Sequence, residues 1–190
     1  TDLAVGAPSY NNDLGKVYVF YGSVAGLTDM VTAWSAEGEV NSTSFGHSLA
    51  GAGDLNGDGY ADLAAGAYVS NDAQGKVYVF YGSNTGLEGT PDSPGWSDVG
   101  EDAENSFGDS LAGAGDVNRD GFADLAVGDS SYDFDLGKVY VFYGSVTGLT
   151  QTAAGADWSV VGEDPFSIYF AWAVAGIGDV GRRPDMVEPA

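Results

Sequence analysis

The stretch Gly75-Lys76-Val77-Tyr78-Val79-Phe80-Tyr81-Gly82-Ser83 decides the fold, because it occurs three times in a chain of 190 residues. The same nine letters stand at residues 15–23 and 137–145, at spacings of 60 (75 − 15) and 62 (137 − 75) residues. Self-similarity at a fixed period indicates a repeat architecture built from one supersecondary unit. One unit therefore has about sixty residues.

Both faces of this strand are apolar. Since side chains alternate along a strand, Val17, Val19 and Tyr21 lie on one face, and Tyr18 and Phe20 on the other. Stacked four-stranded sheets around an axis cover both faces, whereas a β-sandwich leaves one polar face per sheet. The sequence therefore predicts an all-β fold, a β-propeller of four-stranded antiparallel blades, ahead of a sandwich or a solenoid.

The rest of the unit repeats as well. Glycine punctuation and β-branched or aromatic residues predict four strands in the second unit, at about 46–53, 60–67, 75–82 and 95–99. Trp34, Trp96 and Trp158 recur in register and are expected to pack between blades; Lys16, Lys76 and Lys138 are expected to pair with nearby carboxylates. The predicted division is a partial blade at 1–44 that lacks its inner strand, full blades at 45–106 and 107–168, and the start of a further blade at 169–190.

The net charge narrows the classes of partner. The chain has 28 acidic and 6 basic residues, a net charge of −22, and no cysteine. Such a surface repels phosphate, so nucleic-acid binding and a basic membrane-surface helix are not expected, and divalent cations are its natural partners. No apolar run approaches the roughly 20 residues that cross a bilayer, so no membrane insertion is expected either.

Two loops carry oxygen side chains in one pattern, at positions 1, 3, 5 and 9 with glycine at position 6. Ca²⁺ takes 6 to 8 oxygen ligands, which a short loop supplies from alternate positions, and the carbonyl at position 7 would add another. The predicted ligands are Asp54, Asn56, Asp58, Tyr60 and Asp62, and Asp116, Asn118, Asp120, Phe122 and Asp124. Such residues also form ordinary turns. Two copies in register favour two full Ca²⁺ sites, with the ion in a structural rather than a catalytic role.

These elements together resemble a named family. Phe-Gly, then Gly-Asp-x-Asn-x-Asp-Gly-x-x-Asp-Leu, then Val5-Gly6-Ala7-Pro8 and its variants at 65–68 and 127–130, resemble the FG-GAP repeat of integrin α-subunit propellers. The Tyr-Gly-Ser-x-x-Gly-Leu element is similar to a bacterial branch of that family. The resemblance implies the same calcium ligands, on loops opposite the face that usually binds ligands.

The chain also departs from the pattern at its ends. The last loop, Asp179 to Asp185, is two residues shorter than its sisters and has Arg183 in place of a carboxylate, so a third site here would be partial at most. Asp2 matches position 9 of a loop whose earlier positions are absent. About three blades cannot close a ring, since propellers use four or more. We expect either part of a longer chain or self-association, with strand 170–178 of one copy pairing with strands 15–22 and 33–37 of another.

Variable loops next to constant strands predict a ligand face, with Tyr10, Tyr132, Asp133 and Phe134 as contact residues, unless these loops simply vary freely. One histidine, no cysteine and no Gly-x-Ser-x-Gly motif predict a protein that is not an enzyme. The preferred function is a calcium-stabilised propeller module, extracellular or on the cell surface, for adhesion, binding of a protein or glycan, or surface assembly. The alternatives are a structural subunit of an extracellular fibre and the propeller portion of a secreted hydrolase or polysaccharide lyase.

Overall fold

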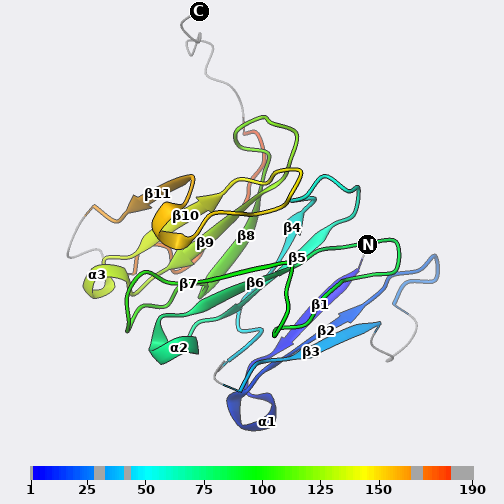
Figure 1. The fold of residues 1–190 in the computed structure, drawn as a ribbon, viewed down its shortest axis with the longest axis horizontal. Coiled ribbons are helices and arrows are strands. Elements are labelled where there is room, and N and C mark those ends of the chain that lie inside the picture. The colour runs from blue at the N-terminus through cyan, green and yellow to red at the C-terminus, as the bar shows by residue number, and fades with distance from the viewer. Residues whose placement is uncertain (1, 28–32, 41–43, 164–168, 181–190) are drawn as a thin grey trace, which may run out of the picture.

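The computed structural model describes residues 2–27, 33–40, 44–163 and 169–180, which form three antiparallel sheets in succession (Figure 1). The first contains, in order, β1 (Leu3–Ala7), β2 (Lys16–Phe20) and β3 (Trp34–Glu37). The second contains β4 (Leu49–Gly53), β5 (Asp62–Ala67), β6 (Lys76–Phe80) and β7 (Trp96–Val99). The third contains β8 (Ser110–Gly115), β9 (Asp124–Asp129), β10 (Lys138–Phe142) and β11 (Trp158–Val161). The predicted fold class is confirmed: these are propeller blades, and they form no closed ring.

Short helical turns connect β1 to β2, β5 to β6 and β9 to β10. They are α1 (Tyr10–Asp13), α2 (Ser70–Ala73) and α3 (Tyr132–Asp135), and a 3-10 turn, η1 (Ala153–Gly155), precedes β11. None of the helices in the described part of the chain combines the length and apolar character that crossing a membrane requires.

The core consists of two apolar layers, one at each boundary between sheets. Val17 and Val19 of β2 pack with Phe45, Tyr78 and Phe80 between the first and second sheets. The equivalent layer between the second and third sheets contains Val77, Val79, Phe107, Tyr140 and Phe142. Both faces of the repeated strand are thus covered in the second sheet, as its alternating apolar residues predict, whereas one face of β2 and one face of β10 are only partly buried. Burial of these side chains contributes about 1.5–3 kcal/mol each.

Glycines of adjacent sheets meet backbone to backbone. A Cβ added to Gly66 would lie 2.1 Å from the carbonyl oxygen of Gly108, and one added to Gly6 would lie 1.9 Å from that of Gly46. Gly108 in turn donates a backbone hydrogen bond to Gly128 within its own sheet. The glycine of Phe-Gly and the glycine of the Val-Gly-Ala-Pro element are therefore required by the close approach of neighbouring blades.

Aromatic and ionic pairs cross the same boundaries. The ring of Trp34 lies 5.0 Å from that of Phe80, and Trp96 lies 5.2 Å from Phe142. Trp158, at the outer face of the third sheet, is 49% exposed. The prediction that tryptophans pack between blades is confirmed for the first two.

The three repeated lysines form ion pairs, as predicted. Lys76 Nζ lies 2.8 Å from Glu39 Oε1, in the chain leaving the first sheet, and Lys138 pairs in the same way with Glu101. Lys16 instead pairs with Glu37 of its own sheet, at 3.0 Å.

The expected pairing of strand 170–178 with another copy stays a prediction, since the structure describes one copy. Within that copy residues 169–180 contain no strand. Strand β2 cannot accept a further partner, because it lies between β1 and β3, whereas β3 pairs with β2 along one side only. The edge that lacks an inner strand is β1. The blade boundaries at 44/45, 106/107 and 168/169 stay predictions.

Candidate metal centre

The first aspartate loop joins β4 to β5 and gathers its oxygens around one amide. The N–H of Asp58 donates to Asp54 Oδ1 at 3.1 Å and to Asn56 Oδ1 at 3.0 Å. Asp58 Oδ1 in turn accepts the amide of Tyr60 at 2.9 Å, and Asp54 Oδ2 accepts that of Gly59 at 2.9 Å. The side chains at positions 1, 3 and 5 are thereby held on the same side of the loop.

The second loop, between β8 and β9, has the same network. The amide of Asp120 donates to Asp116 Oδ1 at 3.1 Å and to Asn118 Oδ1 at 3.0 Å. Asp120 Oδ1 accepts the amide of Phe122 at 2.9 Å. Arg119 adopts φ 63°, where the first loop has Gly57 at φ 73°. The two loops thus share a conformation as well as a sequence pattern, which a pair of unrelated turns would not do.

The aspartate at position 9 differs from the others because it is buried. Asp62 is 3% exposed, its Oδ2 accepts the amide of Leu55 at 2.7 Å, and its Oδ1 accepts that of Gly82 at 2.8 Å. Burial raises the pKa of Asp62 to about 6, against the effect of the two amide bonds. Asp124 is 0% exposed and bonds Val117 and Gly144 in the same way, and burial also raises its pKa. This residue joins the loop to the end of the third strand.

The chemistry of the donors fits a hard cation. Each loop combines three carboxylates, one amide oxygen and a carbonyl at position 7, all ligands that Ca²⁺ accepts. The charges of Asp58 and Asp54 both contribute to raising the pKa of Asp62, so the loop concentrates negative charge. Within the described ranges, however, no three acidic or histidine side chains come close enough together to hold an ion as they stand. Binding would require the exposed carboxylates of positions 1 and 5 to exchange amide partners for the ion.

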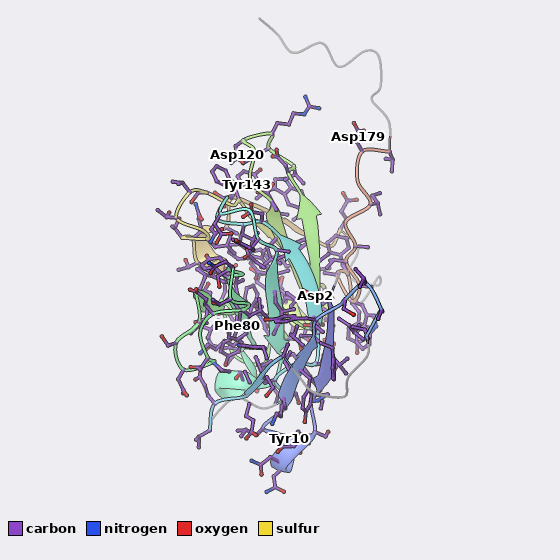
Figure 2. The ribbon with its side chains drawn as sticks, turned by 90° about the vertical axis from the view of Figure 1, so that its right-hand side faces the viewer. Asp2, Tyr10, Phe80, Asp120, Tyr143 and Asp179 are labelled. Carbon is purple, nitrogen blue, oxygen red and sulfur yellow. The ribbon has the colours of Figure 1, made fainter. Side chains whose placement is uncertain are left out.

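Of the three residues predicted as possible partial ligands, the structure describes Asp2 and Asp179. Asp2 Oδ1 accepts the amide of Gly22 at 2.9 Å, as Asp62 and Asp124 do in their sheets. Asp179 is exposed and lies at the same end of the molecule as Asp120 (Figure 2). Asp185 is outside the described residues.

The predicted ligand face lies at the other end. Figure 2 shows Tyr10 and Asp120 at opposite ends of the sheets. Phe134 is 97% exposed and has φ 58°, next to Asp133 at φ 49°. The ammonium group of Lys138 lies 4.7 Å from the centroid of the Tyr132 ring, and that of Lys16 lies 4.9 Å from the centroid of the Tyr10 ring. Phe134, Asp133 and Tyr10 are exposed, whereas Tyr132 is partly buried.

One buried acidic network was not predicted. Asp129 stands where the first two sheets have Ala7 and Ala67, and it is 0% exposed. Its Oδ1 accepts the amide of Ser106 at 2.9 Å, and burial raises its pKa to about 6, with the charge of Asp109 adding to the effect. The sequence does indicate this site, because an aspartate replaces the alanine that the other two copies of the repeat have at this position.

Comparison with known proteins agrees with these repeats. The family model described as FG-GAP repeat matches residues 45–80 and 107–142. Integrin alpha pat-2 of Caenorhabditis briggsae is 42% identical over 123 residues, 64% of this chain and 10% of its own length. Integrin alpha-7 of Rattus norvegicus is 37% identical over 197 residues, 97% of this chain and 16% of its own length.

An enzyme is also among the relatives. Phosphatidylinositol-glycan-specific phospholipase D of Mus musculus is 34% identical over 202 residues, 95% of this chain and 23% of that protein. The chain therefore spans less than a quarter of the length of each of these three relatives. Its repeats, its blades and these similarities agree, and the chain belongs to the FG-GAP repeat family.

Proposed function

We propose that this chain is a calcium-stabilised, extracellular propeller module that binds a protein or glycan in adhesion. The observation that carries the proposal is the pair of aspartate loops, identical in hydrogen bonding, at one end of adjacent blades. The integrin α relatives support the adhesive role.

Two Ca²⁺ ions would be held by the ten residues that the repeat places in register. They are Asp54, Asn56, Asp58, Asp62 and the carbonyl of Tyr60, and Asp116, Asn118, Asp120, Asp124 and the carbonyl of Phe122. A bound ion supplies positive charge that offsets the repulsion among three carboxylates in each loop. Millimolar calcium outside cells suits loops of this kind in extracellular modules.

The structural role of the ion follows from what the loop contacts. The amide of Ser145 donates to the carbonyl of Leu55 at 3.0 Å, so the first loop is bound to the third sheet. Leu55 itself is 0% exposed. Ordering of the loop by an ion would therefore stabilise the boundary between two blades, and the opposite end would stay available for a ligand.

Thermal unfolding with and without a chelator tests the calcium assignment. A ligand at a hundred times its Kd stabilises the folded state by about 2.7 kcal/mol per site, so chelation should lower the midpoint clearly. Asp58→Asn and Asp120→Asn should each reduce the effect of calcium, whereas Asp102→Asn, an exposed carboxylate outside both loops, should not. An unchanged wild-type midpoint in chelator would contradict the assignment.

Binding is tested separately from calcium. Beads that carry the protein are exposed to purified matrix proteins and to a glycan array, in calcium. Phe134→Ala should weaken any binding found, because its ring is exposed at the ligand face. Val146→Ala, an exposed apolar side chain in the loop after β10, is the control. Binding that survives Phe134→Ala unchanged would exclude this face.

One other function has an observation in its favour. The phospholipase relative favours a part of a secreted hydrolase or lyase. Release of a phosphatidylinositol-glycan-anchored reporter, measured with this chain, would support the enzyme and count against the binding module.

A further inference from the structure

The first aspartate loop contains the one Asn-Gly pair of the chain, Asn56-Gly57. In such a pair the backbone nitrogen of the glycine can attack the side-chain carbonyl carbon of the asparagine, because glycine has no Cβ to shield that nitrogen. Whether the attack occurs in a folded protein depends on how the two groups are held and on whether the nitrogen is free to react. The structure bears on both conditions.

A hydrogen bond holds the two reacting groups in one tight turn. The amide of Asp58 donates to Asn56 Oδ1 at 3.0 Å. This bond closes a ring that contains both Asn56 Cγ and the Gly57 nitrogen, so these two atoms stay close together. The same N–H points at the oxygen on which negative charge develops during the attack, and a donor in that place stabilises the transition state.

The amide of Gly57 is also available. Gly57 is exposed, and no described residue accepts a hydrogen bond from its N–H. The chain has two Asp-Gly pairs with related chemistry, at 58–59 and 120–121. Their glycine amides donate to Asp54 Oδ2 at 2.9 Å and to Asp116 Oδ2 at 3.0 Å. The nitrogen must lose its proton to attack, and a carboxylate acceptor holds that proton in place. Among the described residues the structure therefore favours Asn56-Gly57 over both Asp-Gly pairs.

The second loop has the same geometry with a different residue after the asparagine. The amide of Asp120 donates to Asn118 Oδ1, also at 3.0 Å. Residue 119 adopts φ 63°, close to the φ 73° of Gly57, but it is an arginine. Its Cβ lies beside the nitrogen that would have to attack. Asn118 is exposed as well, so the two loops differ for this reaction chiefly in the residue that follows the asparagine.

We propose that Asn56 is a site of spontaneous covalent modification, which converts it to aspartate and isoaspartate. A bond forms between the Gly57 nitrogen and Asn56 Cγ, the bond from Cγ to Nδ2 breaks, and ammonia leaves with the proton of the Gly57 amide. The product is a cyclic imide. Water then adds to either carbonyl carbon of the imide, the bond from that carbon to the nitrogen breaks, and the nitrogen regains a proton.

The reaction changes both the charge and the shape of the loop. A neutral amide becomes a carboxylate, which makes the net charge of −22 more negative by one unit. The hydrogen bond that Asn56 Nδ2 donates to Asp58 Oδ2 at 2.9 Å is replaced by repulsion between two carboxylates. In isoaspartate the main chain also runs through the former side chain and is longer by one carbon. Any effect on calcium binding rests on the function proposed above, whereas the reaction itself does not.

Mass spectrometry of the aged protein tests the proposal. The folded protein is kept in mildly alkaline buffer with a chelator, so that the result does not depend on whether the loops bind calcium. The peptide that contains Asn56 should gain the mass of an amide that becomes a carboxyl group and should separate into aspartate and isoaspartate forms. The peptide that contains Asn118 should stay unchanged. A sample digested at the start corrects for conversion during digestion.

Two variants of the second loop test the role of the glycine. Arg119→Gly removes the Cβ at a position whose φ of 63° glycine adopts more readily than arginine, so the variant should fold. Asn118 should then convert at a rate similar to that of Asn56. Arg119→Ala is the matched control, because it removes the guanidinium group but keeps the Cβ, and it should leave Asn118 intact. Gly57→Ala is less suitable, since the added Cβ would lie 2.5 Å from Cε1 of Phe122.

Four outcomes would overturn the proposal. They are an Asn56 that stays intact, a wild-type Asn118 that is lost as fast as Asn56, equal conversion of Asn118 in Arg119→Gly and Arg119→Ala, and formation of aspartate without isoaspartate. The last would show that water hydrolyses the amide directly, without attack by the Gly57 nitrogen. A failure of the calcium assignment changes none of these measurements.

Discussion

The amide of Ala123 donates a hydrogen bond to the carbonyl oxygen of Asp54 at 3.0 Å. Asp54 is position 1 of the first aspartate loop, and Ala123 is position 8 of the second, so the two candidate metal loops are joined directly. The bond involves only the backbone, and side-chain changes in either loop leave its donor and acceptor in place. Ordering of one loop should therefore favour the conformation of the other.

This contact predicts coupled calcium binding. Asp58→Asn should weaken binding in its own loop and also lower the affinity of the second loop, about fivefold if the coupling is near 1 kcal/mol. Asp120→Asn should weaken the first loop by the same factor, because coupling between binding sites is reciprocal. Calorimetric titration of both variants measures the two affinities. Unaltered affinity at the intact loop in both variants would show that the sites are independent.

A tyrosine hydroxyl joins the second and third sheets. The amide of Leu149 donates to the hydroxyl oxygen of Tyr81 at 3.0 Å. Tyr81→Phe removes the acceptor and should cost about 0.5–1.5 kcal/mol of stability. Tyr143→Phe is the matched control, since Tyr143 is the counterpart in the third sheet and no hydrogen bond of its hydroxyl is found among the described residues. Urea unfolding measures both; equal losses would mean that the bond across the boundary contributes nothing specific.

The ion pair of Lys76 and Glu39 also crosses a boundary, and it is partly buried. The two side chains are 19% and 28% exposed, and the ammonium group lies 4.5 Å from the ring of Tyr78. Lys76→Met should destabilise the protein by about 1–3 kcal/mol, because a partly buried carboxylate loses its partner. Lys16→Met, in a more exposed pair within one sheet, should cost less. Thermal unfolding in low and high salt distinguishes them, and a larger loss for Lys16→Met would contradict this ranking.

The buried Asp129 predicts a dependence of stability on pH. Burial, with the charge of Asp109 nearby, raises its pKa from 3.8 to about 6. The folded state then binds the proton on Asp129 more tightly than the unfolded state does. The stabilisation that this proton gives the folded state is therefore fully present below about pH 4 and is lost as the pH rises through 6. Asp129→Asn should raise stability near neutral pH by about 1–3 kcal/mol and have little effect near pH 4. Unfolding across this pH range measures the difference, with exposed Asp92→Asn as the control; a gain that is equal at both pH values would exclude the titration of Asp129.

Much of the fold was predictable because three copies of one unit can be compared within a single sequence. The strands predicted at 60–67 and 75–82 occur as β5 and β6, since alternating apolar residues specify a strand that is covered on both faces. The ion pairs of the lysines and the packing of the first two tryptophans were also assigned correctly, whereas Trp158 is half exposed.

The errors arose where the repeat is interrupted. Residues 170–178 have the sequence of an inner strand, but a strand requires a neighbouring strand to pair with, and no described strand pairs with this segment. The loop pattern also predicted only part of the role of Asp62. Its position in the loop predicts a ligand, whereas both of its oxygens accept backbone amides from Leu55 and Gly82, which lies twenty residues away.

The sequence by itself determined the period, the strands, the apolar layers and the residues that could bind calcium, because all of these depend on local pattern and on side-chain chemistry. Only the tertiary structure decided which edge is open, which amides occupy the loop carboxylates, and that Asp129 is buried in place of alanine. These features depend on contacts between sheets about sixty residues apart. The spacing of letters within one unit cannot specify such contacts, since identical units have different neighbours at the ends of the stack.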